Sequence, residues 1–290
     1  MSSVVIPALL QTALVADGRV WWLEDVARMV ETLQQRWSLH VGAPFEPGGQ
    51  AAWVAPARND AGDDLVLKVA WRHPEAEHES DGLAVWNGAG AVRLHRVERH
   101  ERSIGLLLER CRPGTSLSSR SEPEQDIVIA RLLRGLWVDP PPDGPFRPLQ
   151  VMCDQWADEF EQQTNEAPGH PDPGLARVGI GLFRSLPSTA DRHVLLATDL
   201  HAGNVLAAKR EPWLVIDPKP YVGDPTYDVL QHLLNCEERL KDNPRALADR
   251  MADLLNLDRD RLMLWLFARC VQESCLSPSL GDVARTIAPG

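Results

Sequence analysis

Apolar and polar residues follow two different periods along this chain, and the change between them divides it into two parts. Residues 21–39 predict an amphipathic helix, because apolar residues recur there every three or four positions. Short apolar runs bounded by glycine, proline and polar residues predict strands over about 40–110, interrupted by a helix near 75–87. The later periods are helical and predict helices at about 121–137, 149–165, 173–186, 225–239, 244–255 and 258–274.

This order of elements predicts an α+β protein with two lobes. The N-lobe, residues 1–111, would hold the opening helix, an antiparallel sheet and one further helix. The C-lobe, residues 112–290, would be mainly helical. Ser121 and Glu124 are spaced as a capping box at the start of a C-lobe helix. The prolines and glycine within 138–148 predict an extended loop after that helix.

Composition and charge limit the classes of function. In 290 residues no apolar run approaches the ~20 residues that span a bilayer, and the N-terminus has no charged leader, so we expect a cytoplasmic protein without a membrane partner. The five cysteines form no C-x-x-C pair, which is typical of reduced thiols. A net charge of −11 argues against a nucleic-acid partner and is compatible with a cationic small-molecule substrate. The oligomeric state is not encoded in any pattern that we recognise.

Three oxygen-bearing residues carry the most informative chemistry. The five-residue step from Asp199 to Asn204, followed by Asp217 after the apolar run 213–216, matches the catalytic loop of kinases. In that loop the first Asp takes the proton of the acceptor hydroxyl, and the Asn and the second Asp hold Mg²⁺ on the phosphates of ATP. Hard oxygen ligands suit Mg²⁺. The runs 194–197 and 213–216 predict a strand hairpin that would carry these residues.

Two other interpretations of this stretch remain open. An Asp-x-His beside a strand often only caps a turn. Metal-assisted hydrolysis, with Asp199, His201 and Asp217 as ligands, is also conceivable. The hydrolytic interpretation gives Asn204 no role, so the spacing favours phosphoryl transfer from ATP, with Asp199 as the base and Asn204 and Asp217 as Mg²⁺ ligands.

Kinases also need a strand lysine on the ATP phosphates and a helix glutamate that holds this lysine. Lys68 interrupts the apolar run 65–71, where an unpaired ammonium group would be costly, although a solvent-facing strand lysine is the simpler alternative. Its partner is predicted to be Glu79, because Leu83 and Trp86 lie four and seven residues further along the same helix face. Glu75 shares that face and is the second choice.

Two segments before the C-lobe are candidates for further ATP contacts. Gly48 and Gly49 could form a phosphate-covering turn, although a Gly-Gly pair between strands is more often an ordinary hairpin turn. The segment from Glu109 to Cys111, followed by a Pro-Gly pair, could be a hinge whose backbone groups bind adenine. A plain turn from strand to helix fits the hinge spacing equally well.

The motifs resemble those of the aminoglycoside phosphotransferases. The runs Leu196–Leu206, Trp213–Lys219 and Val222–Asp228 are similar to that family, and within it to the streptomycin 6-phosphotransferase and hydroxyurea phosphotransferase branch. The segments 106–114 and 77–83 are similar to the hinge and the helix of the branch, so the likeness extends from about 42 to about 235. It implies a bilobal protein-kinase-like fold, and it implies the roles predicted above for Asp199, Asn204, Asp217, Lys68 and Glu79.

One departure from the family pattern lies directly before the predicted base. The family usually has His-Gly there, and this chain has Ala197 and Thr198. A glycine allows a close backbone approach that threonine restricts. A catalytically silent nucleotide-binding protein of the same fold is therefore the alternative to an active kinase.

Two further residues in the family motifs have roles that the sequence leaves open. Lys219 could pair with phosphate or with a neighbouring carboxylate. Asp224 precedes Pro225 and predicts a helix N-cap, and the resemblance implies that it also braces the catalytic loop.

The acceptor substrate is the least determined part of the prediction. Carboxylates of the C-lobe are the natural partners of guanidinium or ammonium groups, and each could equally be a solvated charge on a helix. The candidates are Asp154, Asp158, Glu159, Glu237, Glu238 and Glu273. The chemistry favours a hydroxyl of an aminoglycoside or aminocyclitol such as streptomycin, and another small metabolite or hydroxyurea is the alternative.

Overall fold

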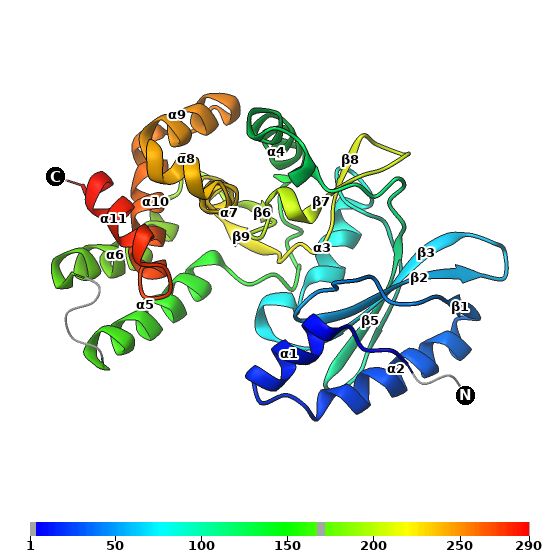
Figure 1. Ribbon diagram of the computed structural model, residues 1–290. Helices are drawn as coiled ribbons and strands as arrows, with labels where there is room; N and C mark the ends of the chain where they lie inside the picture. The colour runs from blue at the N-terminus through cyan, green and yellow to red at the C-terminus, as the bar shows by residue number, and fades with distance from the viewer. Residues whose placement is uncertain (1–3, 167–171, 290) are drawn as a thin grey trace. The chain divides into compact units, whose positions relative to one another are not determined.

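The computed structural model describes residues 4–166 and 172–289 and shows two compact units. Residues 1–114 and 207–214 contribute to the first unit, and residues 115–206 and 215–290 to the second. The helices in Figure 1 are α1 (Ala8–Ala16), α2 (Trp22–Arg36), α3 (Glu79–Trp86), α4 (Glu122–Leu136), α5 (Leu149–Glu166), α6 (Pro173–Ser185), α7 (Leu230–Asn235), α8 (Glu237–Asp242), α9 (Pro244–Leu255), α10 (Arg259–Glu273) and α11 (Pro278–Ile287). The strands are β1 (Leu39–Val41), β2 (Ala52–Asn59), β3 (Asp64–Trp71), β4 (Leu94–Arg99), β5 (Ser103–Glu109), β6 (Val194–Leu196), β7 (Val205–Ala207), β8 (Trp213–Val215) and β9 (Tyr221–Gly223).

A five-stranded antiparallel sheet forms the centre of the first unit, in the order β1-β2-β3-β5-β4. The short apolar runs over 40–110 predicted such a sheet, and the structure confirms it. The predicted helix near 75–87 is shorter than expected, since a 3₁₀ turn at Pro74–Ala76 comes first and α3 begins at Glu79. Of the strands expected after this helix, β4 covers Leu94–Arg99 and β5 covers Ser103–Glu109.

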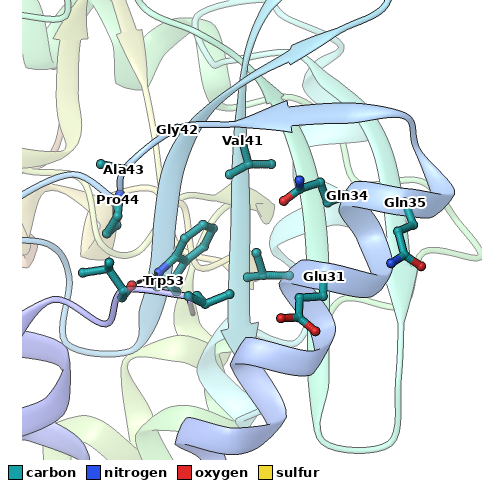
Figure 2. A pocket seen from close by; sticks show the side chains of 11 residues that line it. Glu31, Gln34, Gln35, Val41, Gly42, Ala43, Pro44 and Trp53 are labelled. Carbon is teal, nitrogen blue, oxygen red and sulfur yellow. Dashed lines mark hydrogen bonds between the residues drawn. The ribbon is translucent and has the colours of Figure 1, made fainter. Parts of the chain in front are cut away.

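A cavity of about 450 Å³ lies in the first unit beside the N-terminal segment. Figure 2 shows Glu31 and Gln34 of α2 on one side of it, with Val41 and Trp53 from the strands nearby. The residues that line this cavity include none of the predicted site residues. It is therefore separate from the chemistry that the sequence predicts.

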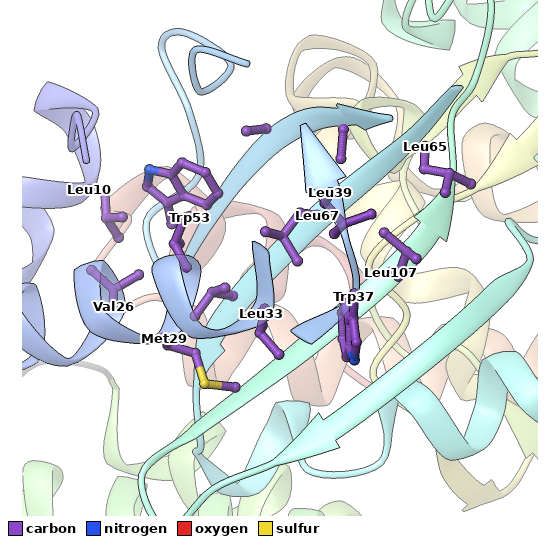
Figure 3. Close-up of a cluster of buried hydrophobic side chains, with 14 of the residues drawn as sticks. Leu10, Val26, Met29, Leu33, Trp37, Leu39, Trp53, Leu65, Leu67 and Leu107 are labelled. Atoms are coloured by element: carbon purple, nitrogen blue, oxygen red, sulfur yellow. The ribbon is translucent and has the colours of Figure 1, made fainter. Parts of the chain in front are cut away.

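One apolar cluster joins α2 to the sheet (Figure 3). Leu65, Leu67 and Val69 of β3 belong to this cluster, because alternate residues of a strand face the same side. Close packing explains Gly105 of β5, where an added Cβ would lie only 2.3 Å from Cδ1 of Leu33. The same alternation turns the β3 residues between these apolar positions toward the opposite face of the sheet.

The second unit is mainly helical, as predicted. The α10 helix is buried along much of its length and packs against α6, α9 and α11. The capping box at Ser121 and Glu124 is present at the start of α4. The predicted helix over 225–239 is wrong in its continuity, because Cys236 leaves the helical conformation and separates α7 from α8. This break allows α8 to pack against both α9 and α11.

The predicted hairpin of 194–197 with 213–216 is wrong in its pairing. The β6 strand pairs with β9, and β8 pairs with β7. A short connection between β7 and β8 costs less chain entropy than the longer one that would join β6 to β8. The two metal-ligand candidates therefore lie beside the two ends of the β7–β8 hairpin rather than on a β6–β8 pair.

Within residues 4–166 and 172–289, every helix is too short or too polar to cross a membrane.

Candidate functional site

The predicted base, Asp199, lies in a tight turn that follows β6. Its backbone N–H donates to the carbonyl of Ala197 at 2.7 Å. The side-chain amide of Asn204 donates to the carbonyl of Asp199 at 3.0 Å, and the backbone N–H of Asn204 donates to the carbonyl of His201 at 2.9 Å. These bonds close residues 199–204 into a compact loop, which explains why the spacing of five residues is needed.

The β7–β8 hairpin brings Asp217 beside this loop. Asn204 directly precedes β7, and its carbonyl accepts the backbone N–H of Ile216 at 2.9 Å. Asp217 follows with a φ of 54°, a left-handed conformation that turns the chain sharply after the strand. Asn204 and Asp217 are therefore neighbours across the base of one hairpin.

The donor set of these residues fits Mg²⁺. The amide nitrogen of Asn204 is used by the carbonyl of Asp199, so the amide oxygen is the atom of this side chain that can bind a cation. The carboxylate of Asp217 would supply a second hard oxygen ligand. Two protein ligands are typical of a Mg²⁺ ion that completes its shell with water and substrate phosphates.

His201 does not have the environment of a metal ligand in this arrangement. Its Nδ1 accepts the backbone N–H of Gly203 at 3.2 Å, so the ring is turned back into its own loop. Burial lowers the pKa of His201, although the carboxylates of Asp199 and Asp217 oppose this shift. The ring is therefore a neutral cap of the turn, and the hydrolytic alternative loses one of its proposed ligands.

Lys219 pairs with the predicted base. Its Nζ lies 3.2 Å from Oδ2 of Asp199, and the two side chains are 30% and 17% exposed. The backbone N–H of Lys219 donates to the carbonyl of Ala197 at 2.8 Å, and its carbonyl accepts the hydroxyl of Thr198 at 2.5 Å. Of the two partners that the sequence left open, the structure shows the carboxylate.

A buried carboxylate that sequence reasoning missed holds the start of this loop. Asp228 accepts the backbone N–H of Ala197 at 3.1 Å and that of Thr198 at 2.6 Å. Its third donor is the indole N–H of Trp137, at 3.0 Å. Burial raises the pKa of Asp228 to about 6, against the lowering effect of these hydrogen bonds. The sequence signal that could have identified this residue is its position four residues after Asp224, the predicted helix cap.

Asp224 has the structural role that its position before Pro225 predicted. Its Oδ1 accepts the backbone N–H of Thr226 at 2.9 Å. Its Oδ2 accepts Nε of Arg261 at 2.6 Å and the indole N–H of Trp265 at 2.7 Å. The expectation that Asp224 braces the catalytic loop is wrong, because Asp228 makes those bonds and Asp224 is used by α10.

Thr198 occupies a backbone conformation that favours glycine. Its φ is 49°, which explains why the family usually has glycine at this position. Three features of the chain hold the threonine there: the Asp228 carboxylate on its N–H, the Lys219 carbonyl on its hydroxyl and the turn to Asp199. Thr198 therefore adopts this conformation with its backbone N–H and its hydroxyl both hydrogen-bonded.

In the first unit, Lys68 and Glu79 form a buried ion pair. Nζ of Lys68 lies 2.8 and 2.7 Å from the two carboxylate oxygens of Glu79. Lys68 is 6% exposed and Glu79 is 1% exposed. The pairing of these residues is as predicted, and the side chain of Glu75, the second choice, is outside what the structure describes.

The turn at Gly48 and Gly49 contains a left-handed backbone conformation. Gly48 has a φ of 81°, and an added Cβ would lie 2.9 Å from Cβ of Pro7. An added Cβ at Gly49 would make only an ordinary contact, 3.6 Å from the carbonyl oxygen of Ala52. Gly48 is thus required by the turn itself, and a contact of Gly48 and Gly49 with phosphate stays a prediction.

The predicted hinge is held by its side chains. Glu109 accepts Nε of Arg210 at 3.0 Å and the backbone N–H of Arg93 at 3.1 Å. Burial opposes the ionisation of Glu109, but these bonds hold its pKa below the usual range. The backbone N–H of Glu109 donates to the carbonyl of Arg93, so the predicted adenine contact depends on other backbone groups of the segment. Burial raises the pKa of the Cys111 thiol to about 11, which makes it unreactive.

The carboxylates predicted to bind substrate lie on three helices and are mostly paired locally. On α5, Asp154 and Glu159 accept glutamine amides from the same helix, and Asp158 pairs with Arg184 at 2.8 Å. On α8, Glu237 pairs with Lys241, and Glu238 is exposed. On α10, Glu273 pairs with Arg269 at 2.8 Å. Their role in substrate binding stays a prediction.

Comparisons with known proteins identify the family and the fold. Residues 36–278 match the family of aminoglycoside/hydroxyurea antibiotic resistance kinases. The chain is 31% identical to a streptomycin 6-kinase of Streptomyces glaucescens, over 91% of this chain and 86% of that protein. It is 33% identical to a hydroxyurea phosphotransferase of Kitasatospora aureofaciens, over 93% and 78%. Among solved structures, a choline kinase of Streptococcus pneumoniae has the same fold, with a TM-score of 0.61, 13% identity and coverage of 90% and 97%.

Proposed function

The chain belongs to the aminoglycoside/hydroxyurea antibiotic resistance kinases, and we propose that it transfers the γ-phosphoryl group of ATP to a hydroxyl of an aminocyclitol antibiotic such as streptomycin. The observation that carries this proposal is the loop of residues 199–204. In it the side-chain amide of Asn204 donates to the backbone carbonyl of Asp199, which fixes the proposed metal ligand next to the proposed base, and the backbone N–H of Ile216 places Asp217 beside them.

Asp199 is the proposed catalytic base. Its carboxylate takes the proton of the acceptor hydroxyl as the acceptor oxygen forms a bond to the γ-phosphorus, and the bond from that phosphorus to ADP breaks. Asn204 and Asp217 would hold Mg²⁺, which when bound neutralises charge on the phosphates. Lys68, held by Glu79, would bind the phosphates of ATP.

The cationic character of the acceptor is supported by charge. The net charge of −11 favours the approach of a positively charged molecule over that of an anion. A streptomycin 6-kinase and a hydroxyurea phosphotransferase are similarly close relatives, at 31% and 33% identity. Hydroxyurea is uncharged, so a comparison of the two compounds tests the charge argument directly. Because the reaction consumes ATP, a cytoplasmic location is part of the proposal.

The hydrogen bonds of Thr198 support an active enzyme over a catalytically silent nucleotide-binding protein. The substitution of the usual glycine keeps Asp199, Asn204 and Asp217 in one loop-and-hairpin arrangement. A protein that only bound nucleotide would have no need of a fixed base.

Phosphorylation of a panel of acceptors tests the proposal. The purified protein is mixed with Mg²⁺, ATP labelled in the γ-phosphoryl group, and streptomycin, other aminoglycosides or hydroxyurea, and the products are identified by mass spectrometry. We expect a phosphorylated aminocyclitol, and we expect Asp199→Asn to lower turnover by roughly 10²–10⁴-fold with ATP binding retained.

Asp191→Asn is the matched control, because Asp191 is exposed and lies shortly before β6, the strand that Asp199 follows. It should have wild-type turnover. Binding of ATP without transfer to any acceptor would support the silent protein instead, and equal turnover of Asp199→Asn and wild type would remove Asp199 as the base.

A further inference from the structure

Lys219 is held beside Asp199 by its own backbone. Its N–H donates to Ala197, its carbonyl accepts from Thr198, and both partners directly precede the base. The ammonium group lies 3.2 Å from Oδ2 of Asp199 as a result. The backbone bonds between Lys219 and residues 197–198 therefore place the lysine beside Asp199, whatever the freedom of its side chain.

Stability alone gives little reason for this pair. Ion pairs that remain partly exposed to water contribute only ~0–1 kcal/mol. The Lys219–Asp199 pair belongs to that class, whereas Lys68 and Glu79 are buried and joined by two bonds. A lysine that neutralised Asp199 permanently would also obstruct a base that must receive a proton.

The reaction itself gives the lysine a task. The acceptor oxygen must come within roughly 2.6–3.2 Å of the Asp199 carboxylate, and the same oxygen bonds to the transferred phosphorus. Two anions, the carboxylate and the phosphoryl group, then lie next to each other. A cation beside the carboxylate lowers the energy of that approach, most of all when charge develops on the phosphoryl oxygens in the transition state.

His201 does not supply this cation. It stands two residues after the base, but its Nδ1 accepts a backbone N–H and burial lowers its pKa. Among the described residues, the cation in an ion pair with Asp199 is Lys219.

We infer that Lys219 is a catalytic residue that donates a hydrogen bond to a non-bridging oxygen of the γ-phosphoryl group during transfer. The inference rests on the proposed kinase function and adds a residue to it. The ammonium group makes and breaks no covalent bond. The proton of the acceptor goes to Asp199, the acceptor oxygen bonds to phosphorus, and ADP leaves with the bridging oxygen. Lys219 turns from the carboxylate toward the phosphoryl oxygen as these changes occur.

Steady-state kinetics of Lys219→Met and Lys219→Arg test the inference with the acceptor found above. We expect Lys219→Met to lower kcat by roughly 10²–10³-fold, the loss typical of removing one donor to a transition-state oxyanion. The KM for ATP and the melting temperature should change little, and Lys219→Arg should keep part of the rate. Lys209→Met, at an exposed lysine in the β7–β8 turn, is the control and should match wild type.

Sulfur substitution identifies the atom that the lysine contacts. In ATPγS a sulfur replaces one non-bridging γ-oxygen, which weakens a hydrogen bond to that position. The ratio of the rates with ATP and ATPγS should be about tenfold smaller in Lys219→Met than in wild type, because the variant no longer has the bond to lose.

The outcomes separate the inference from the proposed function. If wild type phosphorylates an acceptor and Lys219→Met has the same kcat, the inference is wrong and the kinase proposal stands. An unchanged sulfur ratio with a reduced kcat would show that Lys219 only positions Asp199, which also overturns it. Absence of product with wild type would instead overturn the proposed function.

Discussion

The backbone N–H of Thr198 donates a 2.6 Å hydrogen bond to the buried carboxylate of Asp228, 30 residues further along the chain. The bond fixes a residue whose φ of 49° is otherwise unfavourable, directly before Asp199. Asp228 does not lie in the loop of residues 199–204, which carries the proposed base. Its carboxylate instead holds the backbone of Ala197 and Thr198, the two residues before Asp199. Substitutions of Asp228 therefore test the support of the loop without removing the proposed base.

The pH dependence of stability follows from the burial of Asp228. Burial raises its pKa in the folded protein to about 6, above the ordinary value of 3.8. The protonated group therefore contributes stability that is complete below pH ~4 and is lost as pH rises through about 6. The free energy of unfolding of wild type, minus that of Asp228→Asn, should fall by on the order of 2–3 kcal/mol between pH 4 and 7. Urea denaturation at several pH values measures it, and a constant difference would contradict the raised pKa.

Thr198→Val and Thr198→Gly separate the hydroxyl from the backbone strain. Valine keeps the shape and the positive φ but removes the bond to the carbonyl of Lys219, so we expect a loss of ~1–2 kcal/mol in unfolding free energy. Glycine loses the same bond and relieves roughly 1 kcal/mol of strain, which leaves stability near that of wild type. Turnover should likewise be near that of wild type in Thr198→Gly and lower in Thr198→Val. A glycine variant less stable than the valine variant would show that the strain is not there.

Lys68 and Glu79 give a test that separates stability from nucleotide binding. Because both are buried, Lys68→Met or Glu79→Gln alone removes one charge of a buried ion pair and should cost ~3–5 kcal/mol. The double variant Lys68→Met/Glu79→Leu should recover most of that stability and still bind ATP at least tenfold more weakly. Calorimetric titration with ATP measures the second effect. Normal ATP affinity in the stable double variant would exclude the pair from phosphate binding.

Substitution of Asp126 in α4 is a second change that should lower the stability of the protein. It is fully buried, and its carboxylate accepts His232 at 2.9 Å, Arg239 at 2.9 Å and Arg250 at 2.6 Å. Burial opposes its ionisation, but these bonds hold the pKa of Asp126 well below its usual range. Its stabilising effect is therefore present above pH ~4 and is lost as pH falls below that value.

Asp126→Asn should lower the free energy of unfolding at pH 7 by ~1–3 kcal/mol, because a neutral amide replaces a fully buried carboxylate that accepts hydrogen bonds from His232, Arg239 and Arg250. Asp282→Asn, at an exposed pair with Arg285, should change it by less than ~1 kcal/mol. Asp126, His232 and Cys236 lie close enough to hold a metal ion, but the two guanidinium groups would repel it. Stability that depended on added Zn²⁺ or on a chelator would contradict this interpretation.

Local patterns were enough to predict much of this molecule. Apolar periods predicted α2, α4, α5, α6, α9 and α10 near their observed bounds, because each helix buries one stripe of its own sequence. The pairing of Lys68 with Glu79 was predictable since a lysine inside an apolar strand requires a partner on the helix beside it. The loop from Asp199 to Asn204 was predictable because its own hydrogen bonds set its length.

Other features depended on contacts between distant residues. The α1 and α11 helices were not predicted, and neither was the grouping of residues 207–214 with the first unit. The strand at 194–196 was expected to pair with 213–216, but Tyr221–Gly223 takes that place. The bracing of the loop was assigned to Asp224 and is made by Asp228, since two carboxylates four residues apart carry no sign of which one faces the loop.

The sequence by itself determined the types of chemical group at the site and their local spacing, because short-range hydrogen bonds and residue chemistry act within a few positions of the chain. Only the tertiary structure decided that Lys219 lies against Asp199 and that Asp228 holds Thr198. Those relationships depend on which strands pair and which side chains are buried together. Such choices are made by the packing of the whole unit, and no short segment contains them.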